Sequence, residues 1–211
     1  MSEDHKGKRL TRAQSRMQTR QRLLDAAADT FARKGFAAAS LDEIAEAAGF
    51  SIGAVYSNFT SKDDLFAQLM VDSSGELINR VAHTMDTART EGEHPFRALG
   101  QILIDIADKD IGSAELETEF WLHAVRNPEA METFAQRSKQ TWSSLRAVVV
   151  DVLAYNGVDD TVDPESFATL VSALFDGLVR ERRTDPSRVP EDLFGQALTW
   201  LIAGTPKTQR P

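Results

Sequence analysis

Cysteine is absent from the 211 residues, which excludes disulfides, thiolate metal sites and cysteine nucleophiles. Histidine is also scarce, and no two of the four histidines share a helical turn. No stretch approaches the roughly 18 apolar residues that a membrane-spanning helix needs. The first residues lack the apolar segment of a signal peptide. We therefore expect a cytoplasmic protein with no membrane partner, no metal and no cofactor.

Strand patterns are missing as well, since no sustained alternation of apolar and polar residues and no hairpin turn between β-branched runs occurs. Helical spacing, capping residues and first-turn prolines instead predict an all-α fold of about nine helices. Residues 1–17 are polar and without periodicity, and we expect them to form a flexible basic arm. The expected helices cover about 19–34, 41–48, 52–59, 62–90, 95–109, 114–126, 128–154, 164–183 and 191–203.

Charge is distributed unevenly along the chain. Residues 1–62 hold ten Lys and Arg against seven Asp and Glu, whereas residues 63–211 hold fourteen against twenty-five. A basic end on an acidic body indicates a nucleic-acid contact confined to the N-terminal region. A solvated, charged tail would give the same pattern, so charge alone leaves both interpretations open.

The segment from Ser40 to Phe59 is the most informative part of the sequence. Ser40 and Glu43 have the spacing of a capping box, and Gly49 permits a sharp reversal before a second short helix. This pattern predicts a helix-turn-helix, whose second helix enters a DNA major groove. The side chains on the expected outward face of that helix are small and none is acidic, which would let the helix approach base edges closely. We expect Ile52, Val55, Tyr56 and Phe59 to be held partly inward.

Residues 18–66 resemble the DNA-binding domain of the TetR family of bacterial repressors. The shared features are Leu-x-x-Ala-Ala, Phe and Lys-Gly in the first helix and Leu-x-x-Ile-Ala-x-x-Ala-Gly in the second. The third helix carries Ser51-x-Gly53-x-x-Tyr56-x-x-Phe59, followed by Lys62-x-x-Leu65. The resemblance implies a helix-turn-helix domain over residues 18–62 and an effector-binding and dimerisation domain over residues 63–211.

The resemblance also implies roles for individual side chains. Residues matching positions that contact the DNA backbone are Ser40, Ser51, Tyr56 and Lys62, and those matching base-reading positions are Ile52, Gly53, Ala54 and Ser57. Position 58, commonly His in the family, is Asn58, which is expected to contact phosphate or to read adenine. Further phosphate or minor-groove contacts are expected from Arg16, Thr19 and Arg20 and from the arm residues Lys6, Lys8, Arg9 and Arg12.

The resemblance further implies a homodimer formed by the last two helices, because one helix-turn-helix reads only a few base pairs. Those helices carry more apolar residues than the single stripe that packs on a helix's own domain would need. A helix in the centre of the core would show the same pattern. The expected interface residues are Leu170, Leu174, Leu178, Phe194, Leu198 and Leu201.

The middle helices are expected to hold a small, mostly apolar effector. The candidate lining residues are Phe66, Met70, Glu119, Phe120, Trp121, His123, Trp142 and Phe175, with Glu119 and His123 as polar anchors. For each apolar residue, ordinary core packing is the alternative. Effector binding would shift the helix after Lys62 and release a palindromic operator.

Two other classes of protein compete with this interpretation. A helical-bundle enzyme would rest on Glu91-x-x-His94, but Gly92 and Pro95 argue against a continuous helix there, and the sequence holds no second such pair. Phosphate-loop and nucleophile-elbow motifs are also absent, so we expect no enzyme. A constitutive DNA-binding protein or an activator without a small ligand is the other alternative.

Overall fold

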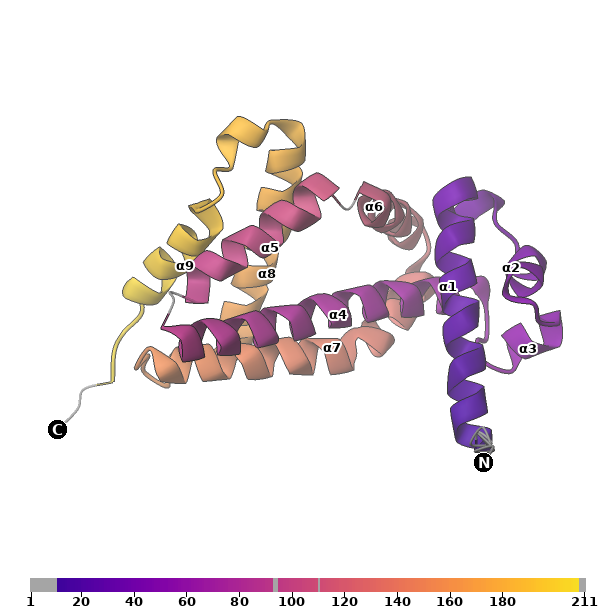
Figure 1. Cartoon of the computed structure of the whole chain (residues 1–211), viewed down its shortest axis with the longest axis horizontal. Coiled ribbons are helices and arrows are strands. Elements are labelled where there is room, and N and C mark those ends of the chain that lie inside the picture. The colour runs from indigo at the N-terminus through magenta and orange to yellow at the C-terminus, as the bar shows by residue number, and fades with distance from the viewer. Residues whose placement is uncertain (1–10, 93–94, 110, 209–211) are drawn as a thin grey trace, which may run out of the picture. The chain divides into compact units, whose positions relative to one another are not determined.

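The computed structural model describes residues 11–92, 95–109 and 111–208, and most of these residues are helical (Figure 1). The α-helices are α1 (Arg12–Ala38), α2 (Leu41–Ala48), α3 (Ile52–Tyr56), α4 (Lys62–Glu91), α5 (Pro95–Lys109), α6 (Ile111–Arg126), α7 (Pro128–Tyr155), α8 (Pro164–Thr184) and α9 (Leu193–Ala203). A short 3-10 helix, η1 (Pro186–Arg188), precedes α9. The prediction of an all-α fold with about nine helices is confirmed. None of the described helices is long and apolar enough to cross a bilayer.

Helix capping explains several of these boundaries. Ser40 accepts a hydrogen bond from Glu43 N–H at 3.3 Å, and the Glu43 carboxylate accepts one from Ser40 N–H at 3.2 Å. Asp163 caps α8 through two backbone N–H groups, with Pro164 in the first turn. These local contacts satisfy N–H groups that a helix leaves without partners. The capping signals in the sequence therefore placed the starts of α2 and α8 correctly.

The predicted start of the first helix is wrong. Helix α1 begins at Arg12, where Thr11 and Gln14 form a reciprocal capping box. The expected arm therefore overlaps the helix over Arg12–Met17, while Lys6, Lys8 and Arg9 lie outside the described residues. The added turns are exposed, so they carry no apolar stripe that periodicity could detect.

The chain divides into two compact units. The first, here called the head unit, comprises the chain up to Leu69 together with Leu116–Phe134. The second, here called the body unit, comprises Met70–Glu115 and Ala135 onward. Helices α4, α6 and α7 each contribute residues to both units. The sequence did not predict that most of α6 belongs with the N-terminal helices, and the functional division at Lys62 stays a prediction.

The core of the body unit forms where α5 packs against α8 and α9. Phe194 and Leu198, predicted for a dimer interface, are instead buried in this core at 4% exposure each. Leu174, Leu178 and Leu201 are partly buried against the same core, whereas Leu170 is 58% exposed. Because α9 is apolar on more than one side, sequence periodicity could not tell its inner face from its outer face.

Two glycines allow α5 and α9 to come close. A Cβ at Gly195 would lie 2.5 Å from the Phe96 carbonyl oxygen, and one at Gly100 would lie 2.5 Å from the Glu191 carbonyl oxygen. Both neighbours are backbone atoms, so neither contact can be relieved by a side-chain rotation. We expect Gly195→Ala to lower the free energy of unfolding by about 1–3 kcal/mol, the usual cost of overpacking.

Thermal and denaturant unfolding would measure this change. Gly75→Ala in α4 is the matched control, because no atom lies within 4 Å of its added Cβ. It should stabilise the protein by about 0.5–1 kcal/mol through helix propensity. Equal stability of the two variants would contradict the close packing of α5 on α9.

Candidate nucleic-acid interface

The turn between α2 and α3 sets the direction of α3. Gly49 ends α2 in the left-handed conformation, with φ 73° and ψ 33°, and its N–H bonds back to Ala45 O. Ile44 of α2 and Val55 of α3 are both fully buried, and Phe59 beyond α3 is 1% exposed. These apolar contacts fix one face of α3 inward. The opposite face is consequently presented outward on a rigid support.

The outward face of α3 is small and free of acidic groups. Gly53 and Ser57 are exposed, and Ile52 and Ala54 are partly exposed. A Cβ at Gly53 would meet only Ser51 Oγ, at an ordinary 3.6 Å, so the protein itself does not require glycine there. Such a surface can lie against base edges in a major groove without collision or like-charge repulsion.

Tyr56 departs from the expected inward orientation, since it is 60% exposed. Val55 and Phe59 are buried in the core, and Tyr56 lies outside it. An exposed phenol hydroxyl can donate to a phosphate oxygen, which suits the backbone-contacting role that the resemblance implied. Ser51 is also exposed and makes no side-chain capping bond to α3.

Arginines of α1 bind the C-terminal ends of the two short helices. Arg22 donates to Ala48 O at 2.8 Å, Arg16 to Ser57 O at 3.3 Å, and Arg20 to Asn58 O at 3.1 Å. Cations at helix C-termini satisfy free carbonyls and oppose the negative end of the helix dipole. Arg16 and Arg20, predicted as DNA contacts, thus also hold α3 in place, and the sequence offered no signal for Arg22.

A shallow polar groove of about 470 Å³ lies beside the outward face of α3. It is lined by Thr11, Arg12, Ser15, Arg16, Thr19, Ser57 and Asn58. Four hydroxyls, one amide and two guanidinium groups meet there, and none of the lining residues is acidic. These are the groups that bind phosphate oxygens in DNA complexes. Thr11 and Ser15 were not predicted, although the capping box of Thr11 with Gln14 was a usable signal.

The Asn58 amide binds back to α3 and to the residue beside it. Its Nδ2 donates to Ala54 O at 2.8 Å and to Ser57 Oγ at 3.2 Å. An amide nitrogen has two hydrogens, so both donors are used locally. The bidentate contact with adenine that Asn can make requires such a donor. The structure therefore favours a local role for the amide over adenine reading.

Ser40 belongs to a charged cap at the start of α2. Its partner Glu43 forms an ion pair with Lys34, whose Nζ lies 2.5 Å from Oε1. The Lys34 ammonium, with the Ser40 N–H, holds the pKa of Glu43 below its ordinary value. The Glu43 carboxylate is therefore charged near neutral pH. The cap is lost only as the pH falls and this carboxylate is protonated. The Ser40 side chain is exposed, and its contact with phosphate stays a prediction.

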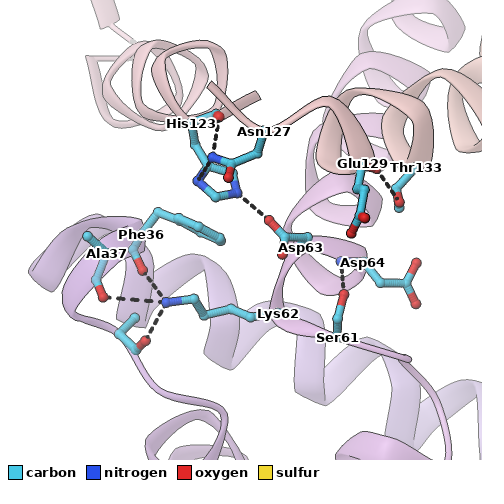
Figure 2. A network of polar contacts seen from close by, with 11 residues as sticks. Phe36, Ala37, Ser61, Lys62, Asp63, Asp64, His123, Asn127, Glu129 and Thr133 are labelled. Atoms are coloured by element: carbon cyan, nitrogen blue, oxygen red, sulfur yellow. Dashed lines mark hydrogen bonds and ion pairs between the residues drawn. The ribbon is translucent and has the colours of Figure 1, made fainter. Parts of the chain in front are cut away.

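The Lys62 ammonium donates hydrogen bonds to backbone carbonyl oxygens, as Figure 2 shows. Its Nζ donates to Phe36 O at 2.8 Å, Ala39 O at 3.0 Å and Ala37 O at 3.4 Å. It also lies 4.4 Å from the centroid of the Phe36 ring. An ammonium has three hydrogens, and three carbonyls take them. The geometry thus favours an internal role over the phosphate contact that the resemblance implied.

The residues predicted to line an effector site are divided between the units. Phe66 and Phe120 belong to an aromatic cluster of the head unit, with ring centroids 5.6 Å apart. Glu119 and His123, the predicted polar anchors, bind head residues instead: Glu119 accepts from Phe36 N–H, and His123 Nε2 contacts Asp63 Oδ1. Trp121 is 47% exposed. These five residues therefore form part of the head unit, and the prediction of Glu119 and His123 as anchors is not supported.

Three candidates remain in the body unit. Met70 is buried, Trp142 is exposed at 42%, and Phe175 packs on Phe194 with ring centroids 5.4 Å apart. Phe175 thus also fits ordinary core packing. Periodicity identified large apolar residues but not the neighbours that each one meets. Within the described residues, no group of three or more His, Asp or Glu side chains is arranged to hold a metal.

Comparison with known proteins agrees with this geometry. Residues 23–69 match the family model of bacterial regulatory proteins of the tetR family. Residues 96–205, about half of the chain, match the model of the C-terminal domain of BetI-type transcriptional repressors. The chain therefore belongs to the tetR family of bacterial transcriptional regulators.

Similar proteins match over most of their length. The chain is 24% identical to the transcriptional regulator TtgR of Pseudomonas putida over 89% of this chain and 90% of TtgR. It is 27% identical to the nicotine-responsive transcriptional repressor HdnoR of Paenarthrobacter nicotinovorans, over 82% and 88% of the two chains. The solved structure of GusR from Salmonella enterica matches with a TM-score of 0.66 and 25% identity, over 93% and 98%. These relatives support regulation of transcription rather than enzyme activity.

Proposed function

We propose that this protein is a transcriptional repressor that binds a palindromic operator as a homodimer and is released by a small, mostly apolar effector. The observation that carries the proposal is the outward face of α3. Gly53 and Ser57 are exposed there without an acidic neighbour on the helix, and a groove of hydroxyls and guanidinium groups lies beside them. The first surface suits base edges and the second suits phosphates.

Exposed apolar residues on the last two helices support the homodimer. Leu170 of α8 is 58% exposed and Trp200 of α9 is 63% exposed, whereas the inner sides of both helices face the core of the body unit. Burial of these side chains against a partner would be favourable, because the core of the body unit leaves them exposed to water. A second copy of the chain satisfies them and supplies the second reading helix that a palindrome requires.

The effector is assigned to the body unit, where Met70, Trp142 and Phe175 remain as candidate contacts. The relative HdnoR is named a nicotine-responsive repressor, which supports a small organic effector for this chain as well. An effector that binds better to the free protein than to the DNA-bound form would shift α4 and separate the two reading helices from successive major grooves. Those grooves are about 34 Å apart.

Selection from random duplexes tests the DNA proposal. We expect the full chain to enrich a palindrome whose half-sites are spaced by about one helical turn or a multiple of it. Binding of random duplex with equal affinity would contradict the proposal. A compound panel, screened by thermal unfolding, tests the effector: a ligand at 100 times its Kd should stabilise the protein by about 2.7 kcal/mol and release it from the selected palindrome. Stabilisation without release would contradict the proposed response.

A further inference from the structure

The last turn of α1 and its C-cap, Gly35 to Ala39, lead to α2, and this turn begins with a backbone conformation that only glycine adopts easily. Gly35 has φ 76° and ψ 162°, which breaks the helix before the turn continues to Ala39. A Cβ at Gly35 would lie 2.7 Å from Glu119 Oε1 of α6. The Glu119 carboxylate therefore occupies the space that a side chain at position 35 would fill.

Two charged residues hold the polar groups of this turn. The Glu119 carboxylate accepts a hydrogen bond from Phe36 N–H. The Lys62 ammonium of α4 binds the carbonyls of Phe36, Ala37 and Ala39 at 2.8, 3.4 and 3.0 Å. The carboxylate thus accepts from a backbone N–H, and the ammonium donates to three carbonyl oxygens, as the charges of these groups require.

A second set of contacts ties α6 to α4 beside the turn. His123 Nε2 contacts Asp63 Oδ1, and Asn127 Nδ2 lies 3.2 Å from His123 Nδ1 (Figure 2). The imidazole also packs on the Phe36 ring, with ring centroids 4.4 Å apart. These contacts fix the positions of Glu119 and Lys62 relative to one another. All of these residues belong to the head unit.

We propose that Glu119 and Lys62 are positioning residues for DNA reading, which rests on the proposed function. They hold the turn from Gly35 to Ala39, and this turn leads directly into Ser40, the cap of α2. Because α3 is packed on α2, the angle of this turn sets the angle of the reading helix. Without these contacts the turn would sample more orientations. Part of the favourable free energy of DNA binding would then be lost to ordering the turn, which weakens affinity.

The test measures affinity for the palindrome selected by the wild-type full chain. We expect Glu119→Ala to weaken binding about tenfold relative to Glu132→Ala, which removes the same charge from an exposed site in the same unit. Glu119→Gln should restore affinity to within about threefold of the wild type, since an amide oxygen also accepts from Phe36 N–H. Amide hydrogen exchange at Phe36 should accelerate in Glu119→Ala and remain slow in Glu119→Gln.

Lys62→Ala separates positioning from phosphate contact. We expect it to weaken binding to the selected palindrome about tenfold while leaving the salt slope of log Kd unchanged. Loss of a phosphate contact would instead reduce that slope by about one. The double variant Glu119→Ala, Lys62→Ala should lose less affinity than the product of the single losses, because both residues hold one turn.

Three results would overturn the inference. They are affinity of Glu119→Ala within twofold of Glu132→Ala, a salt slope reduced by about one in Lys62→Ala, and tighter binding by either single variant. If Glu119→Ala fails to fold, the Glu119→Gln variant provides the test. Faster amide exchange at Phe36 in that variant, or a loss of affinity greater than threefold, would contradict the inference. A wild-type chain that selects no duplex would instead refute the proposed function.

Discussion

Replacing Leu170 by Glu should convert the proposed dimer to a monomer and weaken operator binding by about 10²–10⁴-fold. Leu170 is an exposed apolar side chain on α8, so an interface there would bury the new carboxylate without a partner. Two linked reading helices bind the second half-site at a high effective concentration, and a monomer loses this advantage. Trp200→Glu in α9 should act in the same way, because Trp200 is also exposed.

Three measurements on one set of variants test this expectation. Sedimentation gives the oligomeric state, titration gives affinity for the whole palindrome and for one half-site, and thermal unfolding gives stability. Ala147→Glu in α7 is the matched control, since it places the same charge on another exposed helical position of the body unit. The control should remain dimeric. A Leu170→Glu protein that stays dimeric and binds the palindrome normally would remove α8 from the proposed interface.

Replacing Gly53 by Leu should reduce operator affinity by about 100-fold or more without lowering stability. The added side chain would project from the exposed face of α3, where a Cβ meets only Ser51 Oγ at 3.6 Å. One good base contact contributes about 1–3 kcal/mol of discrimination, and a side chain that holds the helix away from the groove disturbs several contacts together. Leucine also favours helix by close to 1 kcal/mol over glycine, so the melting temperature should stay equal or rise.

A graded series makes this prediction sharper. Gly53→Ala should give a smaller loss of affinity than Gly53→Leu, because a methyl group intrudes less than an isobutyl group. Gly75→Ala provides a control glycine on α4 whose Cβ has no neighbour within 4 Å. It should leave DNA binding unchanged. Wild-type affinity of Gly53→Leu for the selected palindrome would show that α3 does not enter the groove by this face.

Local signals in the sequence predicted most helix boundaries. The Ser40 and Glu43 capping box and Pro164 after Asp163 each act within four residues, so their geometry follows from the helix itself. The first helix shows the limit of this reasoning. Its opening turns are exposed on all sides, and hydrophobic periodicity carries no signal where no face is buried.

Side-chain roles were predicted less well than helices. The outward placement of Gly53 and Ser57 followed from the spacing of apolar residues on a short helix, which buries one side of it. Asn58 differed because its amide donates to acceptors four residues and one residue earlier in the chain. Glu119 and His123 were sought in an effector site because they lie one turn apart, but spacing does not reveal what a helix face meets.

By itself, the sequence determined the helical class, the helix-turn-helix and the small, acid-free face of α3. Each depends on contacts between residues close along the chain. Only the tertiary structure decided that Glu119 binds Phe36, 83 residues away, and that Lys62 binds the same turn from 26 residues away. Long charged side chains can satisfy their hydrogen bonds in many ways, and the choice among partners is made by which backbone groups the folded chain leaves within their reach.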